Sequence, residues 1–279
     1  MVSKPVRIAL IGASGRMGRS IIANARDDTN VAIVAAIVSP GSAVAGQDAG
    51  EQAGGAPIGV RCSADLAAGL HDATVAIDVT RADQVARNAA ACATAQVPLV
   101  VCTTGLSADA EWQLRAVART VAVLVAPNTS VGVAVLSALV RQAAQSLPET
   151  FDIEIVEAHH KHKRDAPSGT ALALAEAAAA GRGVELADVK VTDRTGEKRR
   201  EPGEIGLVSV RAGSIVGTHT VYFAGLGELV TLKHEATDRG IFARGGLRAA
   251  AWLAGRGPGR YSMGDVIEAQ EQPFGRSGT

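Results

Sequence analysis

Residues 6–19 read VRIALIGASGRMGR and decide the fold of the first part of the chain. The run Val6 to Ile11, apolar apart from Arg7, ends at a glycine, as a buried strand of a parallel sheet does. Gly12, Gly15 and Gly18 follow at intervals of three residues, directly before a segment that predicts a helix. A strand, a glycine turn and a helix in this order indicate a dinucleotide site. The glycines let the backbone approach a pyrophosphate, and the N-terminus of the helix offers free N–H groups.

The motif departs from the G-x-G-x-x-G spacing, because Ser14 stands where the second glycine would be. Its alternative interpretation is a tight turn that binds no ligand. The residue that contacts the adenosine ribose is expected about twenty positions further on, at the end of the second strand. Val38-Ser39-Pro40 offers no carboxylate for the ribose hydroxyls and no arginine for a 2′-phosphate, although Arg16 and Arg19 could reach such a phosphate. The choice between NAD and NADP therefore stays open.

The alternation of strand and helix continues to about residue 130. Apolar runs predict four further strands, at 31–38, 74–79, 99–102 and 121–126. Helical stretches are expected between them, at 83–96 and 107–119. Repeated strand–helix units predict an α/β fold with a Rossmann-type, doubly wound parallel sheet.

The pattern changes after about Val131. A long helix over 131–147, an alternating strand over 151–158 and an alanine-rich helix over 169–180 are expected first. Three β-rich runs follow, at 205–210, 218–223 and 228–234. Because turns that contain glycine separate them, this half is predicted to form an α+β domain with an open mixed or antiparallel sheet. A last helix over 245–254 is expected to return to the first domain.

The composition is that of an ordinary globular protein, with 47% hydrophobic and 20% charged residues in a chain of 279. The 28 basic and 28 acidic residues balance, and 3% of residues are aromatic, so no nucleic-acid partner is expected. Cys62, Cys92 and Cys102 are far apart and form no C-x-x-C motif, which indicates reduced thiols. Since no stretch resembles a signal peptide or a membrane span, we expect a cytoplasmic protein without a membrane partner.

Residues 157–171, EAHHKHKRDAPSGTA, hold three of the six histidines among three cationic side chains. His160 and His162 have a spacing that suits zinc, but the surrounding positive charges would repel a dication, and no metal is expected. A nucleic-acid patch is disfavoured by the zero net charge. A solvated charged loop is the ordinary interpretation of such a run, but it does not account for the residues that follow.

Pro167-Ser168-Gly169-Thr170 leads directly into the alanine-rich helix. Proline and serine are common where helices begin, and a glycine there lets a ligand approach the backbone. Such an N-terminus binds carboxylates or phosphates, and the adjacent histidines can transfer a proton near neutral pH. A cofactor domain, an anion site and a proton donor together predict a reductase that acts on a small acidic molecule.

Two more loops leave the carboxyl ends of predicted strands, at 102–105 and 126–130. In an open α/β sheet this is the edge at which ligands bind. The hydroxyl and amide groups of these loops suit a nicotinamide ribose and carboxamide. Ordinary turn formation and helix capping are the alternative role for each of these residues.

The segment EAHHKHKRDAPSGTA resembles the signature segment of the dihydrodipicolinate reductase family, the 4-hydroxy-tetrahydrodipicolinate reductases of lysine and diaminopimelate biosynthesis. The resemblance extends over nearly the whole chain. Further motifs fall in the order of the family: IGASGRMGR at 11–19, DAGE at 48–51, TTG at 103–105, NTSVGV at 128–133 and VRAGSIVGTHT at 210–220.

The resemblance implies reduction by NADPH or NADH of a cyclic dicarboxylate that loses water. By position, His159 would be the proton donor and acceptor and Lys163 a second proton donor, while His160, Gly169 and Thr170 would hold the carboxylates of the substrate. The implied cofactor contacts are Gly12, Ala13, Ser14, Gly15, Arg16, Met17, Ser39, Cys102, Thr103, Thr104, Ala126, Pro127, Asn128 and Thr129. It also implies a homotetramer, with residues 1–130 and 240–279 as the dinucleotide-binding domain and 131–239 as the substrate-binding and oligomerisation domain.

The chain departs from the pattern of the family at two places. Some members have Glu-Arg where this chain has Val38-Ser39, and many carry an aromatic residue where it has Thr129. Two rival functions stay open: a nicotinamide-dependent enzyme for another acidic metabolite, and a nucleotide-sensing module without catalysis. The presence of His159 and Lys163 beside the anion site argues against the sensor.

Overall fold

The computed structural model describes residues 4–197 and 199–268, and the chain divides into two compact units. The first unit extends to Ser130 and resumes at Gly240, and the second comprises Val131–Arg239. Residues 1–3 and 269–279, which the sequence assigned to the first domain, lie outside the described residues.

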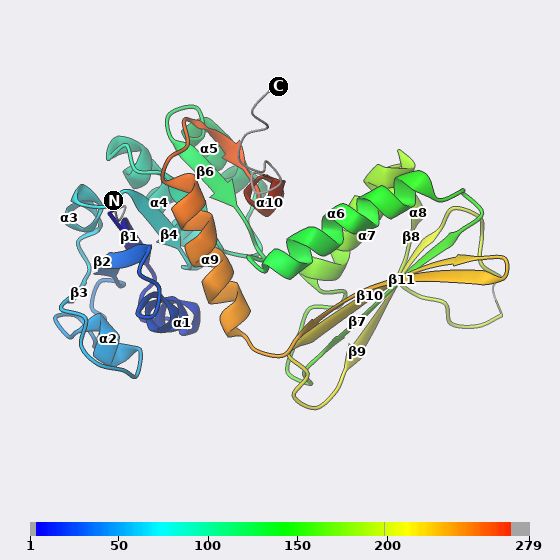
Figure 1. Cartoon of the computed structure of the whole chain (residues 1–279), viewed down its shortest axis with the longest axis horizontal. Helices are drawn as coiled ribbons and strands as arrows, with labels where there is room; N and C mark the ends of the chain where they lie inside the picture. Colours follow the sequence, from blue (N-terminus) through cyan, green and yellow to red (C-terminus); the bar gives the residue numbers. More distant parts are fainter. Residues whose placement is uncertain (1–3, 198, 269–279) are drawn as a thin grey trace, which may run out of the picture. The chain divides into compact units, whose positions relative to one another are not determined.

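The first unit contains a parallel sheet with the order β12-β6-β5-β4-β1-β2-β3 in the described part of the chain (Figure 1). The strands are β1 (Val6–Ile11), β2 (Val31–Ile37), β3 (Cys62–Ser63), β4 (Val75–Asp78), β5 (Leu99–Val101), β6 (Ala122–Val125) and β12 (Gly259–Tyr261). β1 pairs with β2 on one side and with β4 on the other. The sheet is therefore doubly wound, and the order in which successive strands are added reverses beside β1. The predicted Rossmann-type sheet is confirmed.

The helices of this unit are α1 (Arg16–Ala25), α2 (Ala49–Gln52), α3 (Leu66–His71), α4 (Ala82–Thr94), α5 (Ala108–Val117), α9 (Gly240–Leu253) and α10 (Met263–Glu268). α1 packs against α9 and α4 packs against α5, so that both faces of the sheet are covered (Figure 1). The side chains of Ile8, Leu10 and Ile77 are therefore fully buried, as the apolar runs of their strands predict.

The second unit contains a mixed sheet with the order β11-β10-β7-β9-β8 among its described residues. Its strands are β7 (Asp152–His159), β8 (Lys190–Val191), β9 (Ile205–Arg211), β10 (Gly217–Gly225) and β11 (Glu228–Ala236). β7 lies at the centre, parallel to β9 and antiparallel to β10. This confirms the predicted open mixed sheet.

Helices cover one face of this second sheet: α6 (Val131–Ser146), α7 (Gly169–Arg182) and the short α8 (Leu186–Val189) (Figure 1). Ile153, Ile155, Val221 and Phe223 point toward these helices and form the core of the unit with Leu174. α7 ends at Gly183, whose φ of +69° is the left-handed conformation that closes many helices. Within the described residues, none of the helices combines the length and the apolar character needed to cross a membrane.

Candidate active site

The three glycines of the first turn have different structural roles. Gly12 has a φ of +95°, which favours glycine, and its N–H donates to the carbonyl of Ile37. A Cβ on Gly18 would lie 2.3 Å from the carbonyl oxygen of Gly12, so α1 can pack this close to β1 only with glycine there. Gly15 is exposed at the start of α1, and no side chain caps the helix. Exposed backbone at an uncapped N-terminus suits a pyrophosphate.

The loops that follow β4 and β5 are joined by a hydrogen-bond network around Asp78. This buried carboxylate accepts from the N–H and hydroxyl of Thr80 and, at 2.9 Å, from the Asn88 amide. Burial raises the pKa of Asp78, while these hydrogen bonds oppose the shift. The hydroxyl of Thr103 in turn donates to the Thr80 carbonyl at 2.9 Å. The network therefore fixes the two loops at the carboxyl edge of the sheet.

The predicted cofactor hydroxyls differ in their surroundings. Thr103 and Thr129 are buried, and Thr129 donates to the carbonyl of Phe242 at 2.6 Å. These two hydroxyls hold the loops together, whereas Thr104 and Pro127 are exposed at the same edge. Of the remaining predicted residues of these loops, Ala126 is buried, and Cys102 and Asn128 are half-buried. Of the three threonines, Thr104 is therefore the one exposed at this edge.

The residues that follow β2 change from buried to exposed. Val38 is buried, and its N–H donates to the carbonyl of Ser63 at 2.9 Å. Ser39 is exposed beyond it, and Arg16 is exposed at the start of α1. Arg19 is held to the turn, because its Nε donates to the carbonyl of Ser14 at 2.9 Å. Ala13 is buried and Met17 is half-buried in the same turn.

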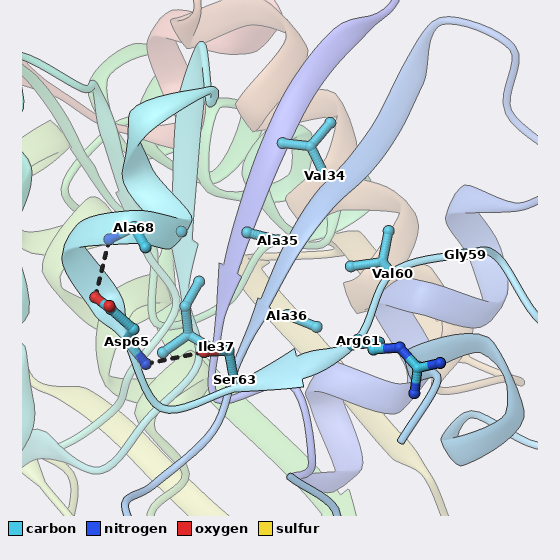
Figure 2. Close-up of a pocket in the computed structure, with 11 residues that line it drawn as sticks. Val34, Ala35, Ala36, Ile37, Gly59, Val60, Arg61, Ser63, Asp65 and Ala68 are labelled. Atoms are coloured by element: carbon cyan, nitrogen blue, oxygen red, sulfur yellow. Dashed lines mark hydrogen bonds between the residues drawn. The ribbon is translucent and has the colours of Figure 1, made fainter. Parts of the chain in front are cut away.

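A cavity of about 290 Å³ lies elsewhere in this unit, between β2, β3 and α3 (Figure 2). Its lining residues include none of the predicted cofactor contacts. Asp65 caps α3 by accepting from the N–H of Ala68 at 2.9 Å, and Arg61 donates to the carbonyl of Gly46 at 2.7 Å. Because these polar groups already have structural partners, the cavity is not assigned to the site.

In the second unit, β7 carries the predicted proton donor. Alternate residues of this strand point toward the covering helices, and Glu157 and His159 continue the row that Ile153 and Ile155 begin. Glu157 is fully buried and 9% of His159 is exposed. Two ionisable side chains thus stand at positions that the alternation gives to the core.

Glu157 is the centre of a buried network. Its Oε2 lies 2.6 Å from Nδ1 of His159 and accepts from Nη1 of Arg211 at 2.8 Å. Its Oε1 accepts from Nη2 of Arg211 at 2.7 Å and from the Ser168 N–H at 3.1 Å. Burial alone would raise the pKa of Glu157, but the bonds from Arg211 and His159 lower it to about 2. The carboxylate is therefore ionised wherever the protein is folded near neutral pH.

A second buried imidazole lies beside His159. The rings of His159 and His219 are 5.1 Å apart in an edge-to-face arrangement, and Nε2 of His219 is 3.0 Å from the hydroxyl of Ser168. The same hydroxyl caps α7 by accepting from the N–H of Ala171 at 3.1 Å. His219 thereby links the end of β7 to the start of α7. Burial, and next the nearby His159, lower the pKa of His219 to about 4.

The titration of His219 predicts a stability loss in mild acid. Between pH 6.5 and pH 4 the unfolded chain binds a proton at this residue that the folded chain excludes, so folding weakens as the pH falls. This residue alone should lower the free energy of unfolding by roughly 2–3 kcal/mol across that range. Urea titrations of the wild type and of His219→Gln at both pH values measure the difference. His71→Gln, which changes an exposed histidine, is the control, and equal losses in wild type and His219→Gln would contradict the prediction.

The loop between β7 and α7 holds the remaining predicted residues. Nζ of Lys163 lies 2.8 Å from Oδ2 of Asp165, and 22% of the lysine side chain is exposed. His160 begins this loop, and desolvation together with the charge of Arg239 lowers its pKa. A Cβ on Gly169 would contact nothing within 4 Å, so the first turn of α7 is open. Thr170 follows in that turn, which contains no acidic residue. A dicarboxylate would therefore meet positive charge and an open helix N-terminus here.

Metal binding finds no geometric support in this loop. Among residues 4–197 and 199–268, no three histidine, cysteine or acidic side chains are grouped closely enough to share an ion. His160 and His162, which have the spacing of zinc ligands, have ring centroids 6.3 Å apart.

Two family models together span most of the chain: the N-terminus of dihydrodipicolinate reductase matches residues 6–129, and its C-terminus matches residues 132–267. The chain belongs to the dihydrodipicolinate reductase family. Relatives named 4-hydroxy-tetrahydrodipicolinate reductase include one from Anaeromyxobacter dehalogenans (strain 2CP-C) that is 47% identical over 94% of this chain and 97% of its own length. One from Rhizobium meliloti (strain 1021) is also 47% identical, over 94% of this chain and 97% of the relative.

Solved structures agree with this fold. A dihydrodipicolinate reductase from Paenisporosarcina sp. TG-14, with dipicolinate bound, superposes with a TM-score of 0.74 at 24% identity and covers 92% of this chain and 97% of that one. An amine dehydrogenase from Mycobacterium smegmatis has a TM-score of 0.60 at 16% identity, over 93% and 95% of the two chains. At these identities the likeness concerns the fold alone.

Sequence reasoning missed several residues of the network around His159. Glu157 stands inside the signature segment of the dihydrodipicolinate reductase family, but its charge was not connected to a partner. Arg211 and His219 stand in the motif VRAGSIVGTHT at 210–220, more than 50 residues further along the chain. One signal was available: a glutamate in a strand of strict alternation, on the same face as two isoleucines, requires a buried cation or donor.

Proposed function

We propose that this protein catalyses the reduction of 4-hydroxy-tetrahydrodipicolinate, after loss of water, to tetrahydrodipicolinate in lysine and diaminopimelate biosynthesis. NADPH or NADH would be the reductant. The observation that carries the proposal is His159, held by the buried Glu157 next to Lys163 and the open N-terminus of α7, in a chain 47% identical to reductases of that name. A proton donor and an anion site are what this reaction requires of the second unit.

The reaction requires one hydride and one proton for each molecule reduced. Water leaves with the hydroxyl of one ring carbon and a hydrogen of its neighbour, so that the new C=C bond is conjugated with the ring imine. The hydride adds to the carbon that carried the hydroxyl. The electron pair of the C=C bond moves toward the imine, and the neighbouring carbon then takes a proton, which restores the C=N bond.

His159 is the proposed source of this proton. Its Nδ1 is engaged by Glu157, so Nε2 is the nitrogen left to transfer a proton. Lys163 would be a second proton donor and would neutralise negative charge on the substrate. His160, Gly169 and Thr170 would bind the two carboxylates, through the imidazole, the backbone of the open turn and the hydroxyl.

The residues of the glycine turn fit a nicotinamide dinucleotide. The pyrophosphate would lie over Gly12 to Met17, where Gly15 is exposed and α1 has no side-chain cap. The loops Cys102 to Thr104 and Ala126 to Thr129 would hold the nicotinamide half, and Ser39 the adenosine ribose. A reduced nicotinamide supplies the hydride when bound.

The protein is also proposed to use both NADPH and NADH, and the residues at the end of β2 support this. Ser39 is exposed there, and neither it nor the buried Val38 carries a carboxylate that would repel a 2′-phosphate. The exposed guanidinium of Arg16, one turn away from Gly12, can attract that phosphate without excluding NADH.

The loss of nicotinamide absorbance tests the function directly. Pyruvate and aspartate semialdehyde would be converted to the substrate in situ by the preceding synthase, with NADPH and NADH in parallel. Oxidation that depends on the synthase is the expected result, and the ratio of the two rates measures the cofactor preference. No turnover by a protein that still binds NADPH would contradict the proposal and favour another acidic substrate or a nucleotide sensor.

A homotetramer formed through the second sheet is also proposed. The face of this sheet opposite the helices exposes Val208 and Val210 on β9 and Leu229 on β11, with 48%, 41% and 58% exposed. An uncovered apolar sheet face favours association. Light scattering is expected to give the mass of four chains, and the double change Val208→Glu and Val210→Glu a smaller mass. Val184→Glu, an exposed valine outside the sheet, is the control, and a single-chain mass for the wild type would contradict the tetramer.

The protein is also proposed to be cytoplasmic, because its cysteines form no disulfide bond among themselves. All three are free, and Cys62 and Cys92 are buried. Burial raises the pKa of the Cys92 thiol to about 12, so this side chain behaves as a small apolar group.

A further inference from the structure

Glu157 occupies a position at which an apolar side chain would be the simpler solution. Ile153 and Ile155 precede it on the same face of β7, and its side chain is fully buried. A buried carboxylate must be compensated by hydrogen bonds and an opposite charge, and a hydrophobic residue of similar size often replaces such a pair without loss of stability. The pair of Glu157 and Arg211 therefore calls for an explanation beyond packing.

We propose that Glu157 and Arg211 are positioning residues for His159: Glu157 holds the imidazole with its proton on Nδ1 and its Nε2 toward the space beside Gly217, and Arg211 keeps Glu157 in place as a carboxylate. The inference rests on the proposed function for the direction of proton transfer. A carboxylate that fixes the tautomer of a histidine leaves the other ring nitrogen ready to give or take a proton.

The geometry accounts for both ends of the imidazole. Nδ1 lies 2.6 Å from Oε2 of Glu157, and a Cβ built on Gly217 would lie 3.0 Å from Nε2. Thr218, the next residue, pairs with Ala158 across the two strands, which places Gly217 beside the end of β7. Glycine thus leaves room at the reactive nitrogen, whereas any side chain at 217 would crowd it.

The guanidinium fixes the carboxylate from the other side. Nη1 and Nη2 of Arg211 each donate to one oxygen of Glu157, at 2.8 and 2.7 Å, in the two-pronged arrangement that specifies orientation as well as charge. The charged and titratable groups that interact with His159 are Glu157 on β7, Arg211 on β9, His219 on β10, and His160 and Lys163 on the loop. Glu157 is the one anion in this set. Without it, an imidazolium would lie beside two permanent cations.

The tautomer of His159 provides a test that does not depend on activity. Nitrogen-15 NMR of histidine-labelled protein resolves six residues at most, and mutation of each assigns them. In the wild type, neutral His159 is expected to carry its proton on Nδ1. In Glu157→Gln, this preference should be lost and the pKa of His159 should fall. The control is Glu235→Gln, which replaces an exposed glutamate of the same sheet and should change neither the tautomer nor the pKa of His159.

The pH profile of kcat links the tautomer to turnover. Glu157→Gln is expected to lower kcat by roughly 10- to 100-fold and to move the limb that reports protonated His159 to lower pH. Purely structural damage would lower the amount of active protein without moving that limb.

Wild-type His159 protonated on Nε2 when neutral would overturn the inference, and this measurement does not require Glu157→Gln to fold. An unchanged tautomer and pKa in folded Glu157→Gln would overturn it as well. If the tautomer behaves as expected but the wild type does not reduce the dicarboxylate, the proposed function fails and the positioning role stands. In the opposite case, the wild type reduces the dicarboxylate but Glu157→Gln leaves the tautomer of His159 unchanged. The positioning role then fails and the proposed function stands.

Discussion

Replacing His159 with alanine is expected to lower kcat by roughly 10²- to 10⁴-fold, the range in which a lost proton donor reduces turnover. The adjacent imidazole of His219 is not placed to substitute for it. His219 is buried with its Nε2 at Ser168, and its pKa of about 4 keeps it neutral at the pH of the assay. The affinity for NADPH should be unchanged, because the glycine turn belongs to the other unit. The synthase-coupled assay and NADPH fluorescence measure the two quantities.

His162→Ala is the matched control for this variant. His162 is an exposed histidine of the same loop, and its loss should leave kcat within about twofold of the wild type. If folded His159→Ala retained a similar rate, His159 would have no part in proton transfer.

Replacing Lys163 with alanine is expected to raise KM for the dicarboxylate by roughly 10- to 100-fold and to lower kcat as well. A hydrogen bond from a charged donor contributes about 1.5–3 kcal/mol, which corresponds to this range of affinity. The variant also leaves Asp165, the 2.8 Å partner of Lys163, as a negative charge next to the anion site. Both effects weaken binding of a dianion. Initial rates over a range of substrate concentrations separate KM from kcat.

Lys161→Ala removes an equal charge two residues away. Lys161 is exposed, and its backbone N–H donates to the carbonyl of Gly213. The change should therefore raise KM by less than about threefold at physiological salt, where charges at a distance are screened. Equal effects of the two substitutions would show that only the net charge of the loop matters, and unchanged kinetics in Lys163→Ala would exclude it from the anion site.

Local patterns were sufficient to predict most of the first unit. A stretch buried on both faces, such as Ile8 to Ile11 of β1, must be apolar, and the observed bounds Val6–Ile11 match the predicted strand, with Arg7 exposed near its start. The short strands β3 and β12 were missed, since two or three residues carry no periodicity. β12 is defined by pairing with β6, more than 130 residues earlier in the chain. Such pairings depend on tertiary structure rather than on local sequence.

The candidate site was predictable in the same uneven way. Loops after parallel strands meet at one edge, so Gly12, Cys102 and Ala126 could be grouped without coordinates. The structural roles of the Thr103 and Thr129 hydroxyls could not be predicted from the sequence, because their acceptors are backbone carbonyls brought near by folding. The same holds for the partnership of Glu157 with Arg211, which depends on the register that pairs His159 with Arg211 between β7 and β9.

The return of the chain at Gly240 sets an order of events during synthesis. α9 packs on β4, β5 and β6 and against α1, yet the ribosome makes it only after all of Val131–Arg239. At about 5–20 residues per second, this delay lasts roughly 5–20 s. During that interval the nascent sheet has an uncovered apolar face, and at its end the inserted unit has all of its own strands and helices. The part that emerges first is thus the last to be completed, and it is the part in which a chaperone has most to protect.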